Sequence, residues 1–371
     1  MRTDSDLHER LERAGNHVSV DSQRILDEIR GVGERRRRSR RIQALAVAAV
    51  VGLLGVSVTY QLRFSDDRPK VPGAKPGPSG QIAYLGAYEE SRDLLVLDAA
   101  SGERGALQDG TGAVLWGAWS PDGSRIAYIV EEPRLGYEIV VADADGSDPV
   151  TIVEQDDTGA VGPDLLNLAW SPDGSRIAYS GRTLRRGVAN RTIFIVNADG
   201  SGRATVLDGH WEWVSWSPDG QRLLMSGFPE SETNTARLDL YTAGLDGEEL
   251  VQLTDDAAIE HSPSFSPNGD RIVFSAGGDH DQSVYLVDAD GSHVQELTDR
   301  DGFDFVPVWS PDGAWIAFAS DRGATPKQQA ANRTGEGTTE IAIYVMRPDG
   351  SDVRLIVEVD GALLYPTSWT G

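Results

Sequence analysis

Residues 119–129 read WSPDGSRIAYI, and this phrase decides the fold. Near copies, 44 to 51 residues apart, begin at Trp170, Trp216, Phe265 and Trp309. In S-P-D-G, proline presets the backbone for the second position of a type I turn, and glycine takes the left-handed conformation that closes the turn. The residues on either side are strand formers. Each copy therefore predicts a β-hairpin.

A second phrase follows each copy, as in VYLVDADGSHVQELT at 284–298. Its A-D-G-S segment predicts another tight turn between two strands. Each repeat thus supplies four short antiparallel strands, which we name A to D in chain order, and no helix. Four such strands in 44 to 51 residues are typical of one blade of a β-propeller.

Two incomplete repeats flank the five complete ones. ALLYPTSWTG at 362–371 predicts a lone strand A, whereas PSGQIAYLG at 78–86 and LLVLDAASGERGAL at 94–107 predict strands B, C and D. Together these pieces predict a sixth blade that is closed by the N- and C-terminal strands. Closure removes the free sheet edges of an open array. The expected fold of residues 81–371 is an all-β, six-bladed β-propeller.

These phrases resemble the propeller repeats of the periplasmic translocation protein TolB and its relatives, which also occur in prolyl oligopeptidase-type peptidases. The resemblance covers roughly Gly80 to Gly371 and recurs in every repeat. It implies a six-bladed fold and a history of binding proteins or peptides. It does not imply the function of TolB, which carries an extra α/β domain and is free in the periplasm.

Residues 42–62 carry no charge over 21 positions. As a helix they would span roughly 31 Å, close to the hydrocarbon thickness of a bilayer. A buried core helix would show a polar face, and a secretory signal would begin nearer the N-terminus. We therefore expect a retained transmembrane helix at 42–62 that contacts the lipid bilayer.

The flanks of this segment predict its orientation. RRRRSRR at 35–41 places six arginines before it, whereas the linker at 63–80, rich in Pro and Gly, mixes charges of both signs. The positive-inside rule then places the tail at 1–41 in the cytoplasm and the propeller at 81–371 outside the cell membrane.

This architecture also resembles membrane proteins of actinobacteria that are associated with extracytoplasmic-function sigma factors. The resemblance implies a cytoplasmic protein partner for the tail, such as a sigma factor. The tail carries two short amphipathic patterns around Leu7–Leu11 and Ile25–Ile29. Short helices are marginal on their own, so a merely solvated tail is the alternative.

Composition excludes several classes of function. The chain holds no cysteine, which excludes disulfides and a cysteine nucleophile, and residues 81–371 carry 19 Lys and Arg against 48 Asp and Glu. Such an acidic body repels phosphate backbones, so we expect no nucleic-acid partner. No stretch matches G-x-S-x-G, a Walker loop or H-E-x-x-H. We expect no catalytic residues, no metal and no cofactor, and thus no enzyme.

Acidic residues in DADGSD at 143–148 superficially resemble the start of a calcium loop. The glycine position and the bidentate glutamate of an EF-hand are missing. Because a similar phrase recurs in almost every repeat, we interpret it as a turn in which aspartate bonds its own backbone.

Strand geometry places the uniform A–B and C–D turns at one end of the propeller and the variable B–C and D–A loops at the other. Binding sites concentrate on variable loops held by a rigid scaffold. Residues just ahead of each strand A are predicted to ring the channel mouth at the variable end. They suit a peptide or a cationic group, although at least half of the aromatic members are equally expected to pack between blades. The predicted ligand-binding residues are Trp116, Asn167, Trp211, Glu212, Trp213, Glu260, His261, Asp304, Phe305 and Tyr365.

Two classes of function remain open at this point. The first is a protein- or peptide-binding or sensing module on the outer face of the membrane. The second is a propeller-type enzyme, a lyase or lactonase, with a metal in the central channel. The second would need Glu260 and His261 to converge with Asn167 and Asp304 as metal ligands.

Overall fold

The computed structural model describes residues 78–88, 91–107, 113–132, 136–154, 167–185, 188–229, 237–255, 258–278, 281–298, 303–325, 329, 341–358 and 363–371. The chain from Lys75 to Gly371 forms one compact unit. The predicted tail at 1–41, the predicted transmembrane helix at 42–62 and nearly all of the linker lie outside the described residues. Within the described ranges, no helix has the length and apolar composition needed to cross a bilayer.

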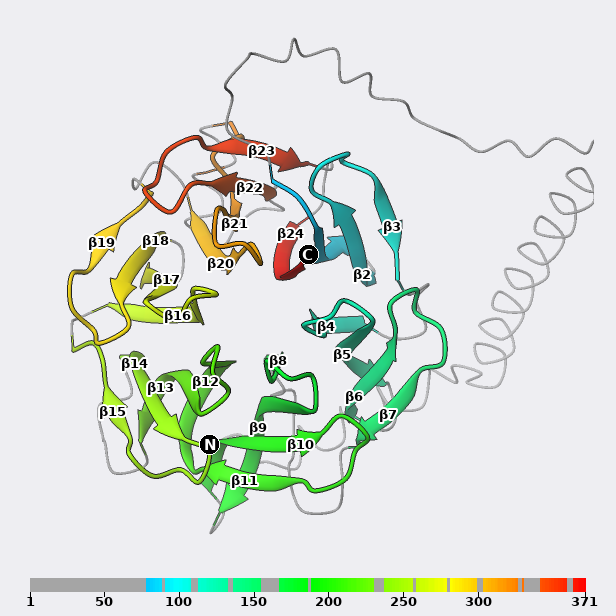
Figure 1. Cartoon of the computed structure of the whole chain (residues 1–371), viewed down its shortest axis with the longest axis vertical. Helices are drawn as coiled ribbons and strands as arrows, with labels where there is room; N and C mark the ends of the chain where they lie inside the picture. Colours follow the sequence, from blue (N-terminus) through cyan, green and yellow to red (C-terminus); the bar gives the residue numbers. More distant parts are fainter. Residues whose placement is uncertain are drawn as a thin grey trace, which may run out of the picture. The chain divides into compact units, whose positions relative to one another are not determined.

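The described strands are arranged around a central axis (Figure 1). The strands nearest the axis, each a strand A, are β4 (Ala113–Trp119), β8 (Leu168–Trp170), β12 (Gly209–Trp216), β16 (Ile259–Phe265), β20 (Asp304–Trp309) and β24 (Leu363–Thr370). The strands that pair with them, each a strand B, are β1 (Gln81–Tyr88), β5 (Arg125–Glu132), β9 (Arg176–Arg185), β13 (Arg222–Pro229), β17 (Arg271–Gly278) and β21 (Ile316–Ser320).

Strands C and D complete each set toward the rim. The third strands are β2 (Ser91–Asp98), β6 (Gly136–Asp143), β10 (Val188–Asn197), β14 (Asp239–Gly244), β18 (Asp281–Asp288) and β22 (Ala342–Met346). The outer strands are β3 (Arg104–Ala106), β7 (Val150–Val153), β11 (Ala204–Leu207), β15 (Val251–Gln252), β19 (Gln295–Glu296) and β23 (Arg354–Val357).

The described strands form four sheets of four strands and one sheet of eight strands. Within each set of four, neighbouring strands are antiparallel, as hairpins require. The larger sheet contains the β8–β11 set and the β12–β15 set, which meet through a single parallel pairing of Arg191 with His210. The described part is therefore an all-β propeller, as the repeats predict.

The S-P-D-G turn is built from local hydrogen bonds. In the first copy the Gly123 N–H donates to the Ser120 carbonyl oxygen over 2.9 Å, and Gly123 has φ +68°, which suits glycine. The Ser120 hydroxyl donates to Asp122 Oδ1 over 2.7 Å and accepts from the Arg125 N–H over 2.9 Å. This hydroxyl, followed by the N–H of Ser124, lowers the pKa of Asp122 to about 2. The phrase thus supplies the hydrogen bonds that form its own turn.

The repeated tryptophan joins neighbouring sets of strands. Trp170 Nε1 donates across the junction to the Ala118 carbonyl oxygen over 2.9 Å. Arg125, from the preceding repeat, lies 4.8 Å from the Trp170 ring centroid and donates to the Gly174 carbonyl oxygen. The same indole bond links Trp216 to Ala169 and Trp309 to Ser264. One phrase therefore makes both the hairpin and the contact with the next one.

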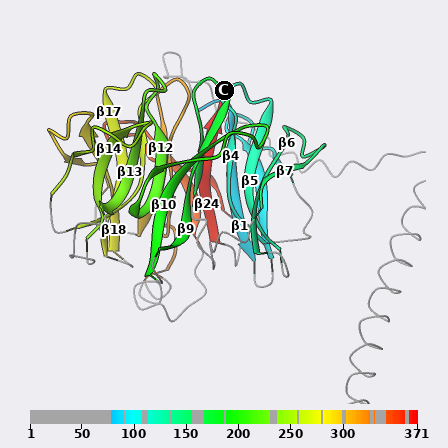
Figure 2. The ribbon, with the colours of Figure 1, turned by 90° about the horizontal axis from the view of Figure 1, so that it is seen from below.

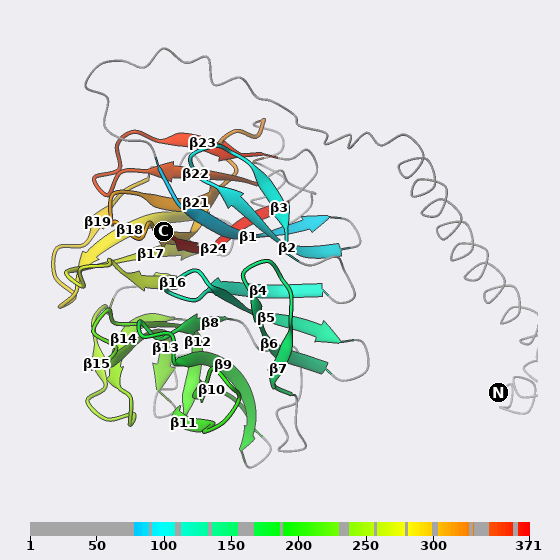
Figure 3. The ribbon, with the colours of Figure 1, turned by 45° about the vertical axis from the view of Figure 1, so that its right-hand side comes forward.

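The C-terminal strand closes the ring beside the first strands of the propeller (Figure 3). β24 pairs antiparallel with β1, from Gln81 opposite Thr370 to Ala87 opposite Leu363. Trp369 Nε1 donates to the Ser79 carbonyl oxygen over 2.8 Å. The two incomplete repeats thus assemble into one sheet, in the order β24-β1-β2-β3.

The strands run between two ends of the propeller (Figure 2). We name the end with the A–B and C–D turns the turn end, and the end with the B–C and D–A connections the loop end. The propeller chain begins and finishes at the turn end, where Gly371 lies against Pro311. The loop end is therefore remote from both Pro78 and Gly371.

Candidate functional site

Irregularities in the inner strands change the direction in which their side chains point. The ladder with strand B shifts register between Val114 and Trp116 in β4, and between Trp211 and Trp213 in β12. β16 and β20 show the same feature between His261 and Ser264 and between Phe305 and Val308. A β-bulge bends its strand and redirects side chains. These shifts all occur where the inner strands border the central channel.

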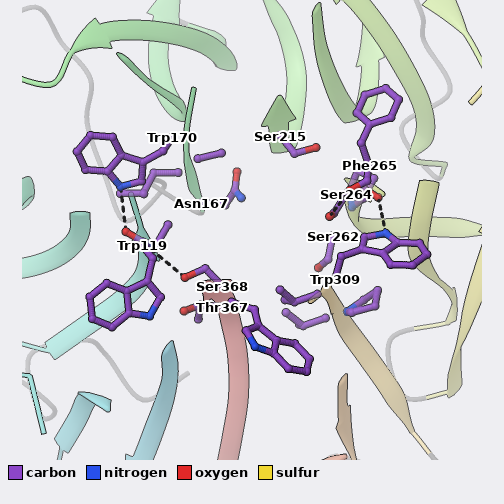
Figure 4. Close-up of a pocket in the computed structure, with 18 of the residues that line it drawn as sticks. Trp119, Asn167, Trp170, Ser215, Ser262, Ser264, Phe265, Trp309, Thr367 and Ser368 are labelled. Atoms are coloured by element: carbon purple, nitrogen blue, oxygen red, sulfur yellow. Dashed lines mark hydrogen bonds between the residues drawn. The ribbon is translucent and has the colours of Figure 1, made fainter. Parts of the chain in front are cut away.

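A cavity of about 300 Å³ lies in the channel and is lined by all the described inner strands (Figure 4). Of the predicted ligand-binding residues, the cavity is lined by Trp116, Asn167 and Trp213. Five of the six repeated aromatic residues line it as well, whereas Trp216 does not. These five are Trp119, Trp170, Phe265, Trp309 and Trp369.

The three predicted residues in the cavity are held by specific contacts. The rings of Trp116 and Trp213 meet edge to face, with centroids 5.1 Å apart. The Asn167 side chain accepts from the Val214 N–H over 2.8 Å and donates to the Val214 carbonyl oxygen over 3.2 Å. Asn167 therefore fastens the start of β8 to β12, and the aromatic pair joins β4 to β12 across the channel.

Glu260 and Asp304 occupy equivalent places at the loop end of β16 and β20, and both are fully buried. The Thr254 hydroxyl donates to Glu260 Oε2 and accepts from the Leu240 N–H. In both repeats the threonine lies six positions before the acid. In the next repeat, Thr298 accepts from the Val284 N–H and hydrogen-bonds to the Asp304 side chain. The buried acids thus anchor the D–A connections to the adjoining strands.

Asp304 has an additional cationic partner. Arg322 Nη2 lies 2.8 Å from Asp304 Oδ2, and its guanidinium lies over the rings of Phe318 and Tyr344 at 4.9 and 5.3 Å. Burial raises the pKa of Asp304 above 3.8, although the charge of Arg322 opposes this shift. Asp321 is also buried and accepts from the Phe303 N–H over 2.8 Å. The first two residues of the long loop at 321–340 are therefore part of the scaffold.

The remaining predicted residues do not line the cavity. Trp211 is fully buried and meets Tyr241 edge to face, with centroids 5.3 Å apart, within the packing of its own sheet. Glu212 forms an ion pair with Arg191. His261 is half-buried in β16, next to Glu260. The expectation that residues ahead of strand A form one ring is therefore met by only some of them, because the bulges turn alternate residues in different directions.

Phe305 and Tyr365 form a separate aromatic group. Phe305 stacks on Phe303 with centroids 4.5 Å apart and meets Tyr365 at 5.4 Å. Burial raises the pKa of the Tyr365 hydroxyl. This contact packs β20 against β24, as the alternative of inter-blade packing predicts. Whether any of the ten residues binds a ligand stays a prediction.

The arrangement required for a metal is not seen in the described part of the chain, where no three His, Asp or Glu side chains form a group suited to a metal ion. Glu260 and Asp304 are engaged by Thr254 and Arg322. In the A-D-G-S turn, Asp145 Oδ1 accepts from the Ser147 N–H over 3.0 Å and from the Ser147 hydroxyl. These contacts agree with the interpretation of DADGSD as a turn.

Sequence reasoning missed the small polar residues of the channel. The cavity is lined by the hydroxyl residues Ser215, Ser262, Ser264, Ser310, Thr367 and Ser368. Three of them, Ser215, Ser264 and Ser368, directly precede the repeated aromatic residue. That register was available in the repeats, since small residues one position before a packed aromatic point to the opposite face of the strand.

Comparison with known proteins agrees with the geometry. The family model described as the TolB beta propeller domain matches residues 123–277 and 261–356. The chain belongs to this family of TolB propeller domains. The membership covers the repeats and accounts for the arrangement of four-stranded sheets around a channel.

Among curated proteins, the chain is similar to the Tol-Pal system protein TolB of Bordetella pertussis, with 25% identity over 288 residues. The similarity covers 74% of this chain and 55% of that protein. The chain thus spans about half the length of this curated relative.

Among solved structures, TolB from Acinetobacter baumannii has a TM-score of 0.62 at 18% identity, over 81% of this chain and 69% of that one. An oligogalacturonate lyase from Vibrio parahaemolyticus has a TM-score of 0.50 at 11% identity, over 76% and 77% of the two chains. At these identities the likeness is one of fold alone.

Proposed function

We propose that this protein is a membrane-anchored, extracytoplasmic β-propeller that binds a protein or peptide partner at its loop end. We further propose that the cytoplasmic tail at 1–41 conveys this binding to a cytoplasmic regulator such as a sigma factor. The transmembrane helix at 42–62 would hold the protein in the cell membrane with its N-terminus inside.

The observation that carries the proposal is the contrast between the two ends of the propeller. The turn end repeats S-P-D-G, with S-P-N-G in one repeat, and in these turns the serine hydroxyl donates to the Asp or Asn two positions later. The loop end carries segments of different length and composition, from GGDHDQ at 277–282 to DRGATPKQQAANRTGEGTTE at 321–340. A rigid scaffold with unlike loops at one end favours recognition at that end.

The position of the chain ends supports the same assignment. The propeller begins and finishes at the turn end, where Gly371 lies against Pro311. Because the propeller chain enters and leaves at the turn end, neither of its ends obstructs a partner at the variable loops.

The chemistry of the loop end favours a polypeptide. The loops alternate acidic segments, such as GFPESETNTAR at 227–237, with the basic GRTLRRGVANR at 181–191. Complementary charge of both signs steers a protein partner and sets its orientation. An overall net charge of −24 disfavours nucleic acid. The name of the curated relative above makes it part of a Tol-Pal system, and a function of that relative together with other proteins fits this name.

The proposal is a binding module rather than an enzyme. The candidate acids Glu260 and Asp304 serve as anchors of the D–A connections, held by Thr254 and by Arg322. Their burial removes them from a substrate in the channel. The structural likeness to a lyase is one of fold and favours no reaction here.

We propose a count of six blades. The eight-stranded sheet would contribute two of them, separated at the single pairing of Arg191 with His210. The sheet β24-β1-β2-β3 would be the sixth, built from both ends of the propeller chain.

The partner test uses the full-length chain in lipid nanodiscs as bait, followed by affinity measurement with the captured protein. Replacing residues 326–340 with a short Gly/Ser connector keeps Asp321 and Arg322 in place. We expect this variant to bind at least tenfold more weakly. The matched control is Asp145→Asn with Asp290→Asn in two turn-end phrases, which we expect to change affinity less than twofold because Asn is also a good turn residue.

The binding proposal is wrong if the loop replacement leaves affinity unchanged while the turn variants abolish binding in a folded protein. Topology is tested separately. A periplasmic-type reporter fused after Gly371 should be active, and protease added to spheroplasts should remove the propeller. Protection of the C-terminus inside the cell would contradict the orientation.

A further inference from the structure

The channel cavity lies toward the turn end, away from the loops of the proposed partner site. Three prolines of the repeated turns line it, namely Pro121 and Pro311 of S-P-D-G turns and Pro267 of the S-P-N-G turn. At about 300 Å³ it falls at the lower end of the volumes of small-molecule pockets. It is therefore too small for a folded partner and large enough for one small molecule.

The lining of this cavity is uncharged. No Asp, Glu, Lys, Arg or His is among its lining residues, although residues 81–371 carry 48 acidic side chains. An ion transferred from water into such a lining would find no opposite charge, which is strongly unfavourable. The cavity thus disfavours metal ions, carboxylates, phosphates and ammonium groups.

The lining also holds hydroxyl groups that need a partner. Ser262 is 7% exposed, and its Oγ has no hydrogen-bond partner in the protein; the same is true of the buried Ser215 Oγ. A buried hydroxyl without a partner costs about 1–3 kcal/mol. Neither oxygen is exposed to the channel, so a guest with hydroxyl groups would remove this cost once the serine side chain rotates toward it, whereas a purely apolar guest would leave the cost in place. Figure 4 shows Ser215 and Ser262 on different inner strands around the open channel.

Backbone strain marks the same part of the channel. Ser262 has φ +51° and Val306, at the equivalent position of β20, has φ +50°. Glycine adopts this conformation freely, whereas a β-branched residue there is a true outlier. Such strain costs on the order of 1–3 kcal/mol per residue and clusters at functional sites. Both residues precede a proline and both line the cavity.

Flat aromatic walls complete the lining. Trp116 and Trp213 border the cavity on the side of β4 and β12, and Trp119 and Trp170 lie nearby. Aromatic faces pack well against the C–H surface of a ring, while hydroxyls at the ring edge need hydrogen bonds. A molecule that offers both kinds of surface fits the combination of tryptophan and serine.

We propose that the channel is a binding site for one uncharged, polyhydroxylated small molecule of about the size of a monosaccharide. The Ser262 and Ser215 hydroxyls would bond its hydroxyl groups, and the tryptophan walls would cover its C–H faces. The ligand enters from the turn end, between the prolines. This site is independent of the partner site at the loop end.

The test measures binding to the full-length chain in lipid nanodiscs, by titration calorimetry and saturation-transfer NMR. The neutral probes are glycerol, myo-inositol, glucose and maltose. The charged probes are glucuronate and glucosamine, and the apolar probe is toluene. We expect at least one neutral probe to bind with a dissociation constant of about 1 mM or tighter, and at least tenfold more tightly than the charged or apolar probes.

Variants locate the site. Ser262→Ala is expected to weaken binding about five- to tenfold, as loss of one hydrogen bond predicts. Ala169→Phe fills the channel and should abolish binding. The matched control is Ser226→Ala, which removes a hydroxyl that is equally buried and without a hydrogen-bond partner but does not line the cavity. It should leave the affinity unchanged.

Several results would overturn the proposal. They are failure of every neutral probe to bind the unaltered protein, tighter binding of a charged or apolar probe, and unchanged binding by a folded Ala169→Phe protein. Near-ultraviolet circular dichroism establishes that each variant is folded. If Ala169→Phe does not fold, a Ser215→Val with Ser262→Val protein takes its place, with the same expected loss and the same overturning result.

Discussion

Aspartate side chains at the two ends of the propeller lie in opposite environments and have opposite pKa shifts. At the turn end, Asp122 is exposed and its pKa is held at about 2 by the hydroxyl and amide of neighbouring serines. At the loop end, Asp304 is buried, and burial raises its pKa despite the nearby Arg322. The contacts of Ser120 with Asp122 and Arg125 join residues two to five positions apart, whereas Arg322 lies 18 positions from Asp304. The hydrogen bonds that hold the Asp122 carboxylate are thus local, whereas the partner of Asp304 comes from the next strand connection.

The largest loss of stability is expected when the ring of strands is opened. Deleting residues 362–371 removes β24, including the buried side chains of Leu364 and Trp369, and exposes the edge of β1. We expect aggregation or a fall in melting temperature of more than about 10 °C. The measurement is thermal melting of the full-length and truncated proteins in nanodiscs. Deletion of Gly371 alone is the control, and a truncated protein as stable as the original would refute closure by β24.

A smaller effect tests the junction between neighbouring sets of strands. Trp170→Ala should destabilise the protein by about 3–5 kcal/mol, because it empties a buried site between two sheets. Trp170→Phe keeps the ring but loses the bond to the Ala118 carbonyl oxygen, and should cost only about 1 kcal/mol. Phe265 naturally occupies this position in one repeat. Denaturant unfolding measures both, and equal losses would mean that the indole N–H, not the ring packing, holds the junction.

The anchoring of the buried acids gives the next effect. Thr254→Val leaves Glu260 and the Leu240 N–H without their shared hydroxyl and should destabilise the protein by about 1–3 kcal/mol. Thr151 provides a matched control, since its hydroxyl makes an exposed hydrogen bond to the Glu138 carboxylate. Thr151→Val should change stability by less than about 0.5 kcal/mol. Equal effects in denaturant unfolding would show that burial of the Thr–Glu pair is unimportant.

The buried acid also predicts a pH dependence. The folded-state pKa of Asp304 is raised above 3.8, so its contribution to stability is present at low pH and is lost as the pH rises through the raised value. Asp304→Asn does not titrate. The free energy of unfolding of this variant, relative to the original protein, should therefore increase from pH 3 to pH 7. A flat or falling difference would show that Arg322 outweighs burial.

The smallest effect concerns the turn end. Asp122→Asn with Asp173→Asn should leave stability at pH 7 nearly unchanged, because Asn268 already fills the same role beside Ser266. Both aspartates have pKa values lowered to about 2, so their contribution is present above pH 3.8 and is lost as the pH falls toward 2. The variant should lack this part of the acid sensitivity in unfolding measured between pH 4 and pH 2. Identical acid sensitivity would contradict the local account of the turns.

The sequence by itself determined the hairpins and their repetition. Pro121, Asp122 and Gly123 build their turn from contacts within a few residues, and the recurrence of the phrase places strands of known type around an axis. The junction of residues 78–86 with 362–371 could also be predicted, because each piece lacks what the other supplies. Such features depend on short-range geometry, which is encoded in consecutive residues.

Only the tertiary structure decided which side chains meet. Trp116 and Trp213 lie almost a hundred positions apart yet pack edge to face, while Trp211, two residues from Trp213, is buried elsewhere. The bulges in the inner strands determine which of these tryptophans meet, and they lie where the strands border the channel. The pairing of Asp304 with Arg322 and the unpartnered hydroxyl of Ser262 arise in the same way. These contacts form only when strands that are far apart in the sequence are brought together. They cannot be predicted from the pattern of consecutive residues.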